Sequence, residues 1–205
     1  MTRSIGVVGA GIVGTNLARA FMSVGHHVVL GARDPLSDKA VAARNELGLD
    51  VVSLDHAAEG RDVVVLAVQY AAVTATVAAL GDVGDAVLVD ATNTVGEELP
   101  EGATSILDVI AETNPSATVV KGFNTIGAEA FVKPTIDSRA LFLPIAGDQP
   151  GADLIAELAT DIGFDALVVG DRTTARIVEN AAELWIHLAF RTGLGRSFGF
   201  ARLER

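Results

Sequence analysis

The sequence predicts an α/β protein with a doubly wound parallel sheet, that is, a Rossmann fold with a small C-terminal α/β cap. Short apolar segments alternate with segments of helical periodicity, which is typical of a parallel sheet covered on both faces. A glycine-rich motif follows directly on the first apolar segment. Half of the 205 residues are apolar, which is enough to bury a substantial core.

The first part of the chain shows the pattern of a dinucleotide-binding unit. Strands are expected where the chain is continuously apolar, and helices where apolar residues recur every three or four positions. The expected strands are 5–9, 28–30, 51–54, 63–68, 86–90 and 118–123, and helices are expected up to 24, at 37–47, up to 80 and at 106–112. Six strands complete the fold, so the NADP-binding Rossmann domain is expected over residues 1–125.

The remaining residues, 126–205, are expected to form a small domain that closes a cleft over the first. Its expected elements are strands at 140–146 and 166–169 and helices at 150–162 and 174–191. In the last helix, apolar residues form one stripe: Ile177, Val178, Ala181, Leu184, Trp185, Leu188 and Ala189. This helix should therefore pack against something large, either the core of its own chain or a partner subunit.

Composition argues against several classes of function. A formal net charge of −11 argues against a nucleic-acid partner, since phosphate binding needs clustered Lys and Arg. The absence of cysteine excludes disulfides and thiolate sites, so redox chemistry must come from a bound cofactor. The uncharged stretch 63–81 is interrupted by Gln69 and Tyr70 and predicts a buried strand and helix, not a membrane span. We expect a cytoplasmic protein.

The glycine-rich motif is Gly9-Ala10-Gly11-Ile12-Val13-Gly14, placed between the first strand and the first helix. This is the context that a dinucleotide fingerprint requires. Gly9 permits a tight turn, Gly11 leaves room for a pyrophosphate, and Gly14 lets helix and strand pack closely. The pyrophosphate would then lie on unpaired N–H groups at the positive end of the helix.

The end of the second strand favours NADP over NAD. The chain reads Ala32-Arg33-Asp34-Pro35 there, so a small residue takes the expected acid position and Arg33 can pair with a 2′-phosphate. Alternatively, Asp34 could receive the ribose hydroxyls of NAD. We prefer Asp34 as a helix N-cap, because Pro35 suits the first helical position.

Ligands of such sheets bind at the carboxyl ends of the strands, which here carry Val68, Gln69, Asn93 and Asn124. The nicotinamide should lie among these residues, and the two asparagines are either contacts of its carboxamide or turn residues. We expect Lys121 to pair with a carboxylate rather than with an anionic cofactor. No catalytic constellation and no metal-ligand spacing is found, and hydride transfer between stacked rings needs neither.

Several segments make the chain similar to the NADPH-dependent reductases of coenzyme F420, an 8-hydroxy-5-deazaflavin. They are residues 9–14, 31–33, 66–68, 91–93, 120–127, 144–148, 183–188 and 195–198. The resemblance implies NADP on the Rossmann half, direct hydride transfer to F420 stacked on the nicotinamide, a 2′-phosphate contact by Arg33, and a homodimer. Ala32 departs from the Ser or Thr often found there, which removes one phosphate hydrogen bond.

The resemblance leaves the hydride acceptor open. Segment 121–127 resembles a broader branch of the family, which includes flavin-linked metal reductases, more than it resembles the archaeal enzymes. Two alternatives therefore remain: an NADPH-dependent reductase of a flavin or a small imine or carbonyl, and a non-catalytic NADP-sensing module.

Overall fold

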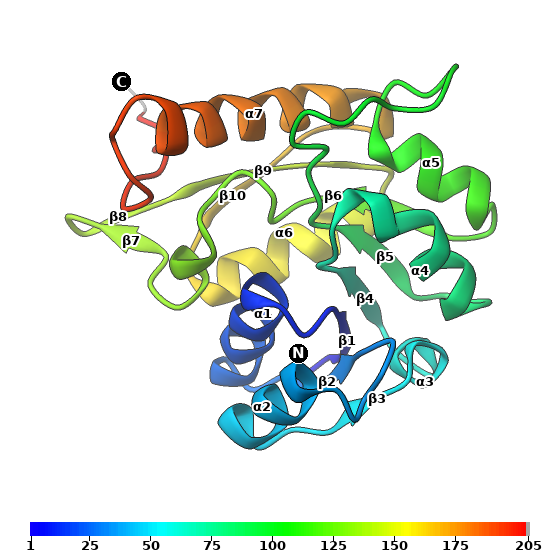
Figure 1. Ribbon diagram of the computed structural model, residues 1–205. Helices are drawn as coiled ribbons and strands as arrows, with labels where there is room; N and C mark the ends of the chain where they lie inside the picture. The colour runs from blue at the N-terminus through cyan, green and yellow to red at the C-terminus, as the bar shows by residue number, and fades with distance from the viewer. Residues whose placement is uncertain (204–205) are drawn as a thin grey trace.

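Eight strands form one sheet in the order β10-β9-β6-β5-β4-β1-β2-β3 in the computed structural model, which describes residues 1–203 (Figure 1). The strands are β1 (Ser4–Val8), β2 (His27–Gly31), β3 (Val51–Val52), β4 (Val63–Leu66), β5 (Val87–Asp90), β6 (Thr118–Lys121), β9 (Phe142–Gly147) and β10 (Asp165–Gly170). The first six pair in parallel, and the strand order reverses next to β1. This is the doubly wound dinucleotide-binding topology, as predicted.

The C-terminal strands continue the same sheet. β9 pairs antiparallel with β6, and β10 pairs parallel with β9. The division into residues 1–125 and 126–205 therefore falls between neighbouring strands of one sheet, and it stays a prediction about folding units. A two-stranded hairpin, β7 (Thr135–Ile136) and β8 (Arg139–Ala140), projects beside the C-terminal tail (Figure 1).

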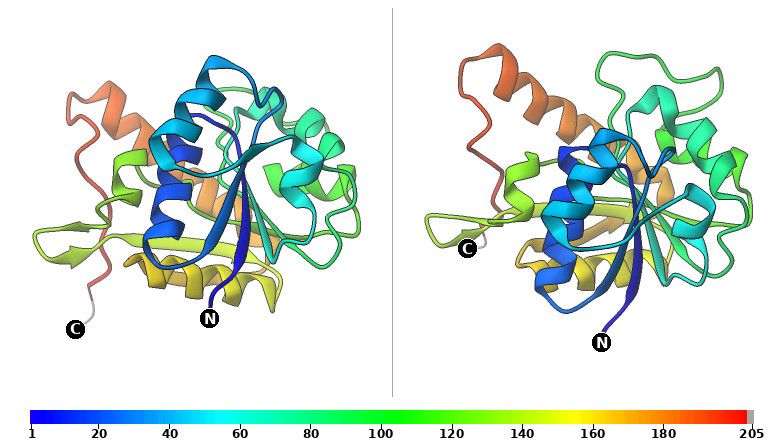
Figure 2. Two further views of the ribbon diagram at one scale, coloured as in Figure 1. Left: turned by 90° about the horizontal axis from the view of Figure 1, so that it is seen from below. Right: turned by 60° about the horizontal axis from the view of Figure 1, so that its bottom comes forward.

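Helices cover both faces of the sheet, and in Figure 2 α1 and α2 lie on the opposite side of the strands from α4 and α5. α1 (Ile12–Ser23), α2 (Asp38–Leu47) and α6 (Gly151–Ile162) contribute to one buried cluster. The other face is covered by α3 (Leu54–Ala58), α4 (Val73–Leu80), α5 (Ile106–Thr113) and the start of α7 (Ala175–Arg191). Three short 3₁₀ helices complete the fold: η1 (Tyr70–Ala72), η2 (Ala128–Phe131) and η3 (Arg172–Thr174).

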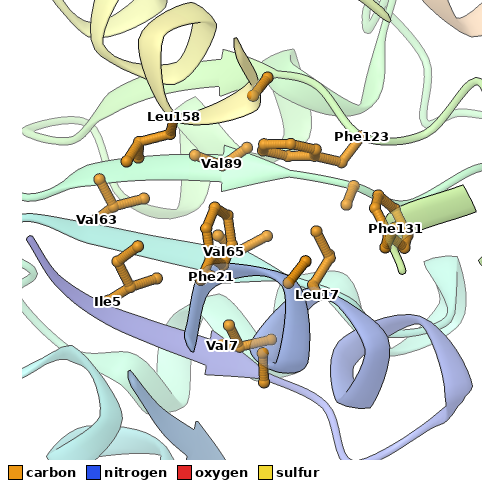
Figure 3. Close-up of a cluster of buried hydrophobic side chains, with 14 of the residues drawn as sticks. Ile5, Val7, Leu17, Phe21, Val63, Val65, Val89, Phe123, Phe131 and Leu158 are labelled. Carbon is orange, nitrogen blue, oxygen red and sulfur yellow. The ribbon is translucent and has the colours of Figure 1, made fainter. Parts of the chain in front are cut away.

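Alternation along the strands divides the core between the two faces. Val63 and Val65 belong to one cluster, whereas Val64 and Leu66 belong to the other. Figure 3 shows the first cluster, in which Phe123 lies among side chains from the strands and helices. Its ring is 5.8 Å from that of Phe21 on α1. This aromatic contact joins the segment after β6 to the first helix.

Some local expectations were wrong. Residues 53–54 leave the strand, and α3 begins at Leu54, because a two-residue β3 suffices at the edge of the sheet. Asp34 is not the N-cap of α2: the cap position is Ser37, and the Asp34 carboxylate instead accepts from the N–H of Leu36, 2.9 Å away. Phe123 lies beyond the end of β6 and adopts a positive φ of 61°.

The predicted stripe of α7 was also partly wrong. Val178 and Trp185 are buried, but Ile177 and Leu184 are exposed. Ala189 of the stripe is buried too, together with Ala175 and Ala182 from outside it. The face that packs on the sheet is therefore narrower and richer in alanine than the sequence suggested, which leaves large apolar side chains on the outer face.

Candidate functional site

The glycine-rich turn brings α1 unusually close to the sheet. Gly9 has a φ of +123°, and a Cβ on it would lie 2.3 Å from the carbonyl oxygen of Ala67. A Cβ on Gly14 would lie 1.9 Å from the carbonyl oxygen of Gly9. Any side chain at either position would therefore push the first turn of α1 away from the carboxyl ends of β1 and β4.

Gly11 plays a different part in the same turn. It is the N-cap residue of α1, and no heavy atom lies within 4 Å of the place a Cβ would occupy. No side chain among the described residues caps this end, and the first turn carries no acid. The unpaired N–H groups of the first turn therefore face open space, and the helix places no acidic side chain beside them. Such a helix end is a suitable place for a phosphate.

Two adjoining cavities run along this edge of the sheet. The first, of about 800 Å³, includes the turn, the facing side of α2 and η2; the second, of about 500 Å³, lies over the ends of β4 and β5. They share the side chains of Val13, Ala67, Val68 and Gln69. Together they make one groove at the point where the strand order reverses; because this fold binds dinucleotides at that point, it is called the coenzyme groove below.

Most of the predicted site residues line this groove. Ala10, Gly11 and Ile12 line the first cavity, Asn93 lines the second, and Val13, Val68 and Gln69 line both. Gly9 and Gly14 shape the turn behind it. Ala32 is buried and Arg33 exposed at the end of β2, and neither is among the residues that line the two cavities.

Asn93 and Asn124 form a reciprocal pair. The Asn93 amide donates to the backbone oxygen of Asn124 at 2.9 Å, and the Asn124 amide donates to Oδ1 of Asn93 at 3.0 Å. Asn124 is 4% exposed and lies behind Asn93. Asn93 therefore faces the second cavity, whereas Asn124 holds it in place.

Lys121 is fully buried beneath these loops. Its Nζ donates to Oδ2 of Asp90 and to the backbone oxygen of Thr92, both at 2.6 Å. The predicted pairing with a carboxylate is confirmed, and full burial keeps the ammonium from any ligand in the groove. Oδ1 of Asp90 accepts from the N–H and hydroxyl of Thr92 at 2.9 and 2.6 Å. The pair thus fixes the loop that carries Asn93.

Glu179 on α7 completes this buried network and was missed from the sequence. Its Oε1 lies 3.6 Å from Nζ of Lys121 and accepts from the N–H of Ile106 at 2.8 Å. The network therefore connects β5 and β6 with α5 and α7. An acid beside the apolar Val178 and Ala182 was the only signal in the sequence.

Tyr70 borders the second cavity and donates from its hydroxyl to the backbone oxygen of Glu98 at 3.3 Å. Burial raises the pKa of the Tyr70 hydroxyl, and the negative charges of Glu97 and Glu179 raise it further. The hydroxyl therefore stays protonated at neutral pH and remains a hydrogen-bond donor.

Two cations in the first cavity were not predicted as site residues. Lys39, in the first turn of α2, lies three and four residues before Ala42 and Ala43, and this spacing puts all three on one face of the helix. Arg196 comes from the tail after α7, within segment 195–198 of the family resemblance, but no pattern in the sequence places it beside the glycine-rich turn. The one acid that lines this cavity, Glu46, pairs with Arg19.

A third cavity, the α7 cavity, adjoins the coenzyme groove. It has a volume of about 580 Å³ between residues 94–99 and α7, and it shares Val95 and Glu97 with the second cavity. His187 is exposed and lines this cavity with Arg176, Glu183 and Arg191. Residues 1–203 contain no acid and histidine cluster placed to hold a metal, and none of their helices is long and apolar enough to span a membrane.

The sheet topology, the glycine turn and the groove define a dinucleotide-binding protein of the Rossmann class. Residues 4–94 match the family described as "NADP oxidoreductase coenzyme F420-dependent". The chain is 32% identical to the F420-dependent NADP reductase of Methanothermobacter thermautotrophicus, over 93% of this chain and 91% of that protein. The protein belongs to the family of F420-dependent NADP reductases.

Other relatives outline the neighbourhood of this family. A crystal structure from Arthrobacter sp. FB24, whose name proposes an F420-dependent NADP-reductase, superposes with a TM-score of 0.85 at 28% identity, over 98% of this chain and 100% of that one. The metalloreductase STEAP3 of Rattus norvegicus is 30% identical over 85% of this chain, which spans only 35% of STEAP3. An imine reductase from Pseudomonas sp., at 16% identity and a TM-score of 0.69, shares the fold.

Proposed function

We propose that the protein transfers hydride between NADP(H), bound in the coenzyme groove, and coenzyme F420. The observation that carries this proposal is the 32% identity, over nearly the whole of both chains, to a protein named F420-dependent NADP reductase. The groove supports it, because it lies at the carboxyl ends of parallel strands, where this fold binds dinucleotides.

The phosphate end of the groove fits NADP. The open space at Gly11 and the N–H groups of α1 would receive the diphosphate. Arg33, exposed at the end of β2, would pair with the 2′-phosphate, and Lys39 adds a second cation on the facing helix. Ala32 offers no hydroxyl to that phosphate.

The other end of the groove would hold the nicotinamide. Val68, Gln69 and Asn93 line it, with the protonated hydroxyl of Tyr70 at its edge. The bound coenzymes supply the hydride chemistry, and the protein's part is to align the two rings and keep water away. No residue is assigned as a proton donor or acceptor, in keeping with the absence of a catalytic constellation in the sequence.

The acceptor would enter from the α7 cavity, which adjoins the nicotinamide end through Val95 and Glu97. His187 and Arg191 offer positive or polar contacts there, and Glu183 is paired with Arg176 at 3.3 Å. A flavin acceptor is the second candidate, because segment 121–127 resembles flavin-linked metal reductases and the chain is 30% identical to part of a protein named as a metalloreductase.

We also propose a cytoplasmic homodimer. Ile177 and Leu184 lie two turns apart on the same side of α7 and are 65% and 51% exposed, which gives the helix an apolar outer face that a second copy of the chain would cover. Sedimentation of the protein against a Leu184→Glu variant tests this: the variant should shift towards the monomer, and identical sedimentation would contradict a dimer built on this face.

An anaerobic optical assay of NADPH oxidation tests the function, with F420, FMN and FAD offered separately. Reduction of F420 alone supports the proposal, and preference for FMN or FAD favours the flavin reductase. Binding of NADPH without turnover of any acceptor would favour a small-molecule reductase or a sensing module.

Two substitutions test the coenzyme assignment. Arg33→Ala should raise the Michaelis constant for NADPH much more than that for NADH, and equal effects would contradict a 2′-phosphate contact. Gly11→Val should leave the fold intact, because no atom is near that position, but should abolish binding of both coenzymes. Retained binding would mean that the diphosphate lies elsewhere.

A further inference from the structure

The geometry points to Arg196, on the tail that follows α7, as a contact of the coenzyme's diphosphate. The tail would then be part of the dinucleotide site, although it is the part of the chain most distant in sequence from the glycine-rich motif. This inference rests on the proposed function, since it takes the dinucleotide as the ligand of the coenzyme groove.

The position of Arg196 is the first support. It lines the first cavity, which also contains Gly11. Within residues 1–203, Arg196 and Lys39 are the two positively charged residues that line this cavity. The acid Glu46 is neutralised by Arg19. In a protein with a net charge of −11, two cations facing the open end of α1 make this cavity a local site for an anion.

Arg196 is held at the edge of the cavity by contacts that leave donors over. Its NH2 donates to Oε2 of Glu129 at 3.0 Å, and its guanidinium carbon lies 5.9 Å from the ring centre of Phe190. Glu129 belongs to η2, which is attached to α1 because Asn16 donates to the carbonyl oxygen of Ala128 at 3.0 Å. A guanidinium has five N–H donors, so it can keep Glu129 and also bind a phosphate.

The tail around Arg196 is packed on the protein. The Trp185 indole N–H donates to the backbone oxygen of Phe198 at 3.1 Å, and the two rings stack with centres 5.4 Å apart. The N–H of Phe142 in β9 donates to the backbone oxygen of Phe200 at 2.8 Å. Arg196 is therefore positioned before a ligand arrives, which lowers the entropy cost of its contact.

Anionic groups could come from either of two sources, the dinucleotide or the tail of the acceptor. The cavities distinguish them. Arg196 lines the cavity that contains Gly11 and is not among the residues lining the α7 cavity, where the acceptor is proposed to enter. The observations favour the diphosphate, which NADPH and NADH share.

Titration of the full chain with NADPH and with NADH, followed by coenzyme fluorescence, tests the inference. Arg196→Gln should raise both dissociation constants by the same factor, about 5- to 20-fold, as expected for a partly exposed charge-assisted contact. Arg196→Lys should recover part of the loss. Arg202→Gln is the matched control, because it removes one charge from the same tail. Arg202 pairs with Asp165 at 2.9 Å, and its replacement should leave both dissociation constants unchanged.

Trp185 is the only tryptophan, so its emission reports whether the tail keeps its place in each variant. Weaker binding with unchanged emission supports the contact. It would be overturned by unchanged binding in Arg196→Gln, by an effect on NADPH alone, or by an effect confined to the Michaelis constant of the acceptor. Weaker binding with altered emission and no recovery in Arg196→Lys would also overturn it. If the unaltered protein binds neither coenzyme, the proposed function itself fails.

Discussion

Replacing Lys121 by methionine should destabilise the protein strongly, by about 3–5 kcal/mol, the range for removing one partner of a buried ion pair. The Nζ of Lys121 is fully buried, 2.6 Å from Oδ2 of Asp90 and 3.6 Å from Oε1 of Glu179. Methionine has a similar length, so the change removes the charge with little loss of volume. The cost comes from leaving buried carboxylates without a cation.

The lower end of that range is expected, because both carboxylates keep other donors. Oδ1 of Asp90 retains the N–H and hydroxyl of Thr92, and Glu179 retains the N–H of Ile106 and lies 3.6 Å from Arg176. For a chain of this size, a loss of about 3 kcal/mol corresponds to a decrease in Tm of roughly 6–12 °C.

Urea denaturation of Lys121→Met, Asp90→Asn and the double variant measures the effect. The asparagine in Asp90→Asn keeps an oxygen for Thr92 but removes the buried charge, so the double variant should lose less stability than the sum of the two single variants. A loss below about 1 kcal/mol in Lys121→Met, or strict additivity, would refute the view that this pair holds the loop by charge.

Three further predictions concern the stability of the fold. Gly14→Ala should cost about 1–3 kcal/mol, measured by urea denaturation, because its Cβ would meet the carbonyl oxygen of Gly9 at 1.9 Å; an unchanged midpoint would contradict the close packing. Burial lowers the pKa of His26 below 6.5 in spite of nearby Asp161, so the unfolded chain takes up the proton at a higher pH than the folded one, and stability should fall as pH drops below 6.5. In His26→Gln, Tm should depend less on pH between about 7.5 and 5.5 than in the unaltered protein. The same dependence of Tm on pH in both proteins would contradict this. Asp108→Ala removes the capping box of α5 and should cost about 1 kcal/mol at pH 7. Partial burial raises the pKa of the Asp108 carboxyl, but hydrogen bonds from Thr104 and Ser105 outweigh this and lower the pKa below 3.8, so the contribution of this group to stability is lost as the carboxylate is protonated. The difference in thermal stability between the two proteins should therefore shrink as pH falls below 3.8, and a constant difference would argue against the cap.

Much of the architecture could be predicted because its causes are local. Continuous β-branched segments form strands that are buried on both faces, and the positive φ of Gly9 and the contact of Gly14 with the Gly9 carbonyl oxygen are set within the motif itself. The strand ends that carry Val68 and Asn93 followed from the same pattern, because parallel strands place their carboxyl ends at one edge.

The expectations that failed concern segments whose local pattern is ambiguous or too short. Asp34 and Pro35 look like a helix start, yet the chain turns once more there, and α2 begins at Asp38 with Ser37 as its N-cap. In α7, periodicity alone does not tell which of two overlapping apolar faces packs inward, and the sheet accepts the alanine-rich one. The short hairpin of β7 and β8 has no apolar run long enough to indicate strands.

The sequence by itself determined the class of fold, the glycine turn and the family, since each depends on residues close together in the chain or on similarity along its whole length. Only the tertiary structure placed Lys39 and Arg196 in the cavity beside Gly11, and Glu179 beside Lys121. The physical reason is that charges are positioned by packing of elements far apart in sequence, whose mutual distances no local pattern encodes. The tail that carries Arg196 joins the groove because its aromatic residues pack against Trp185 and its backbone pairs with β9.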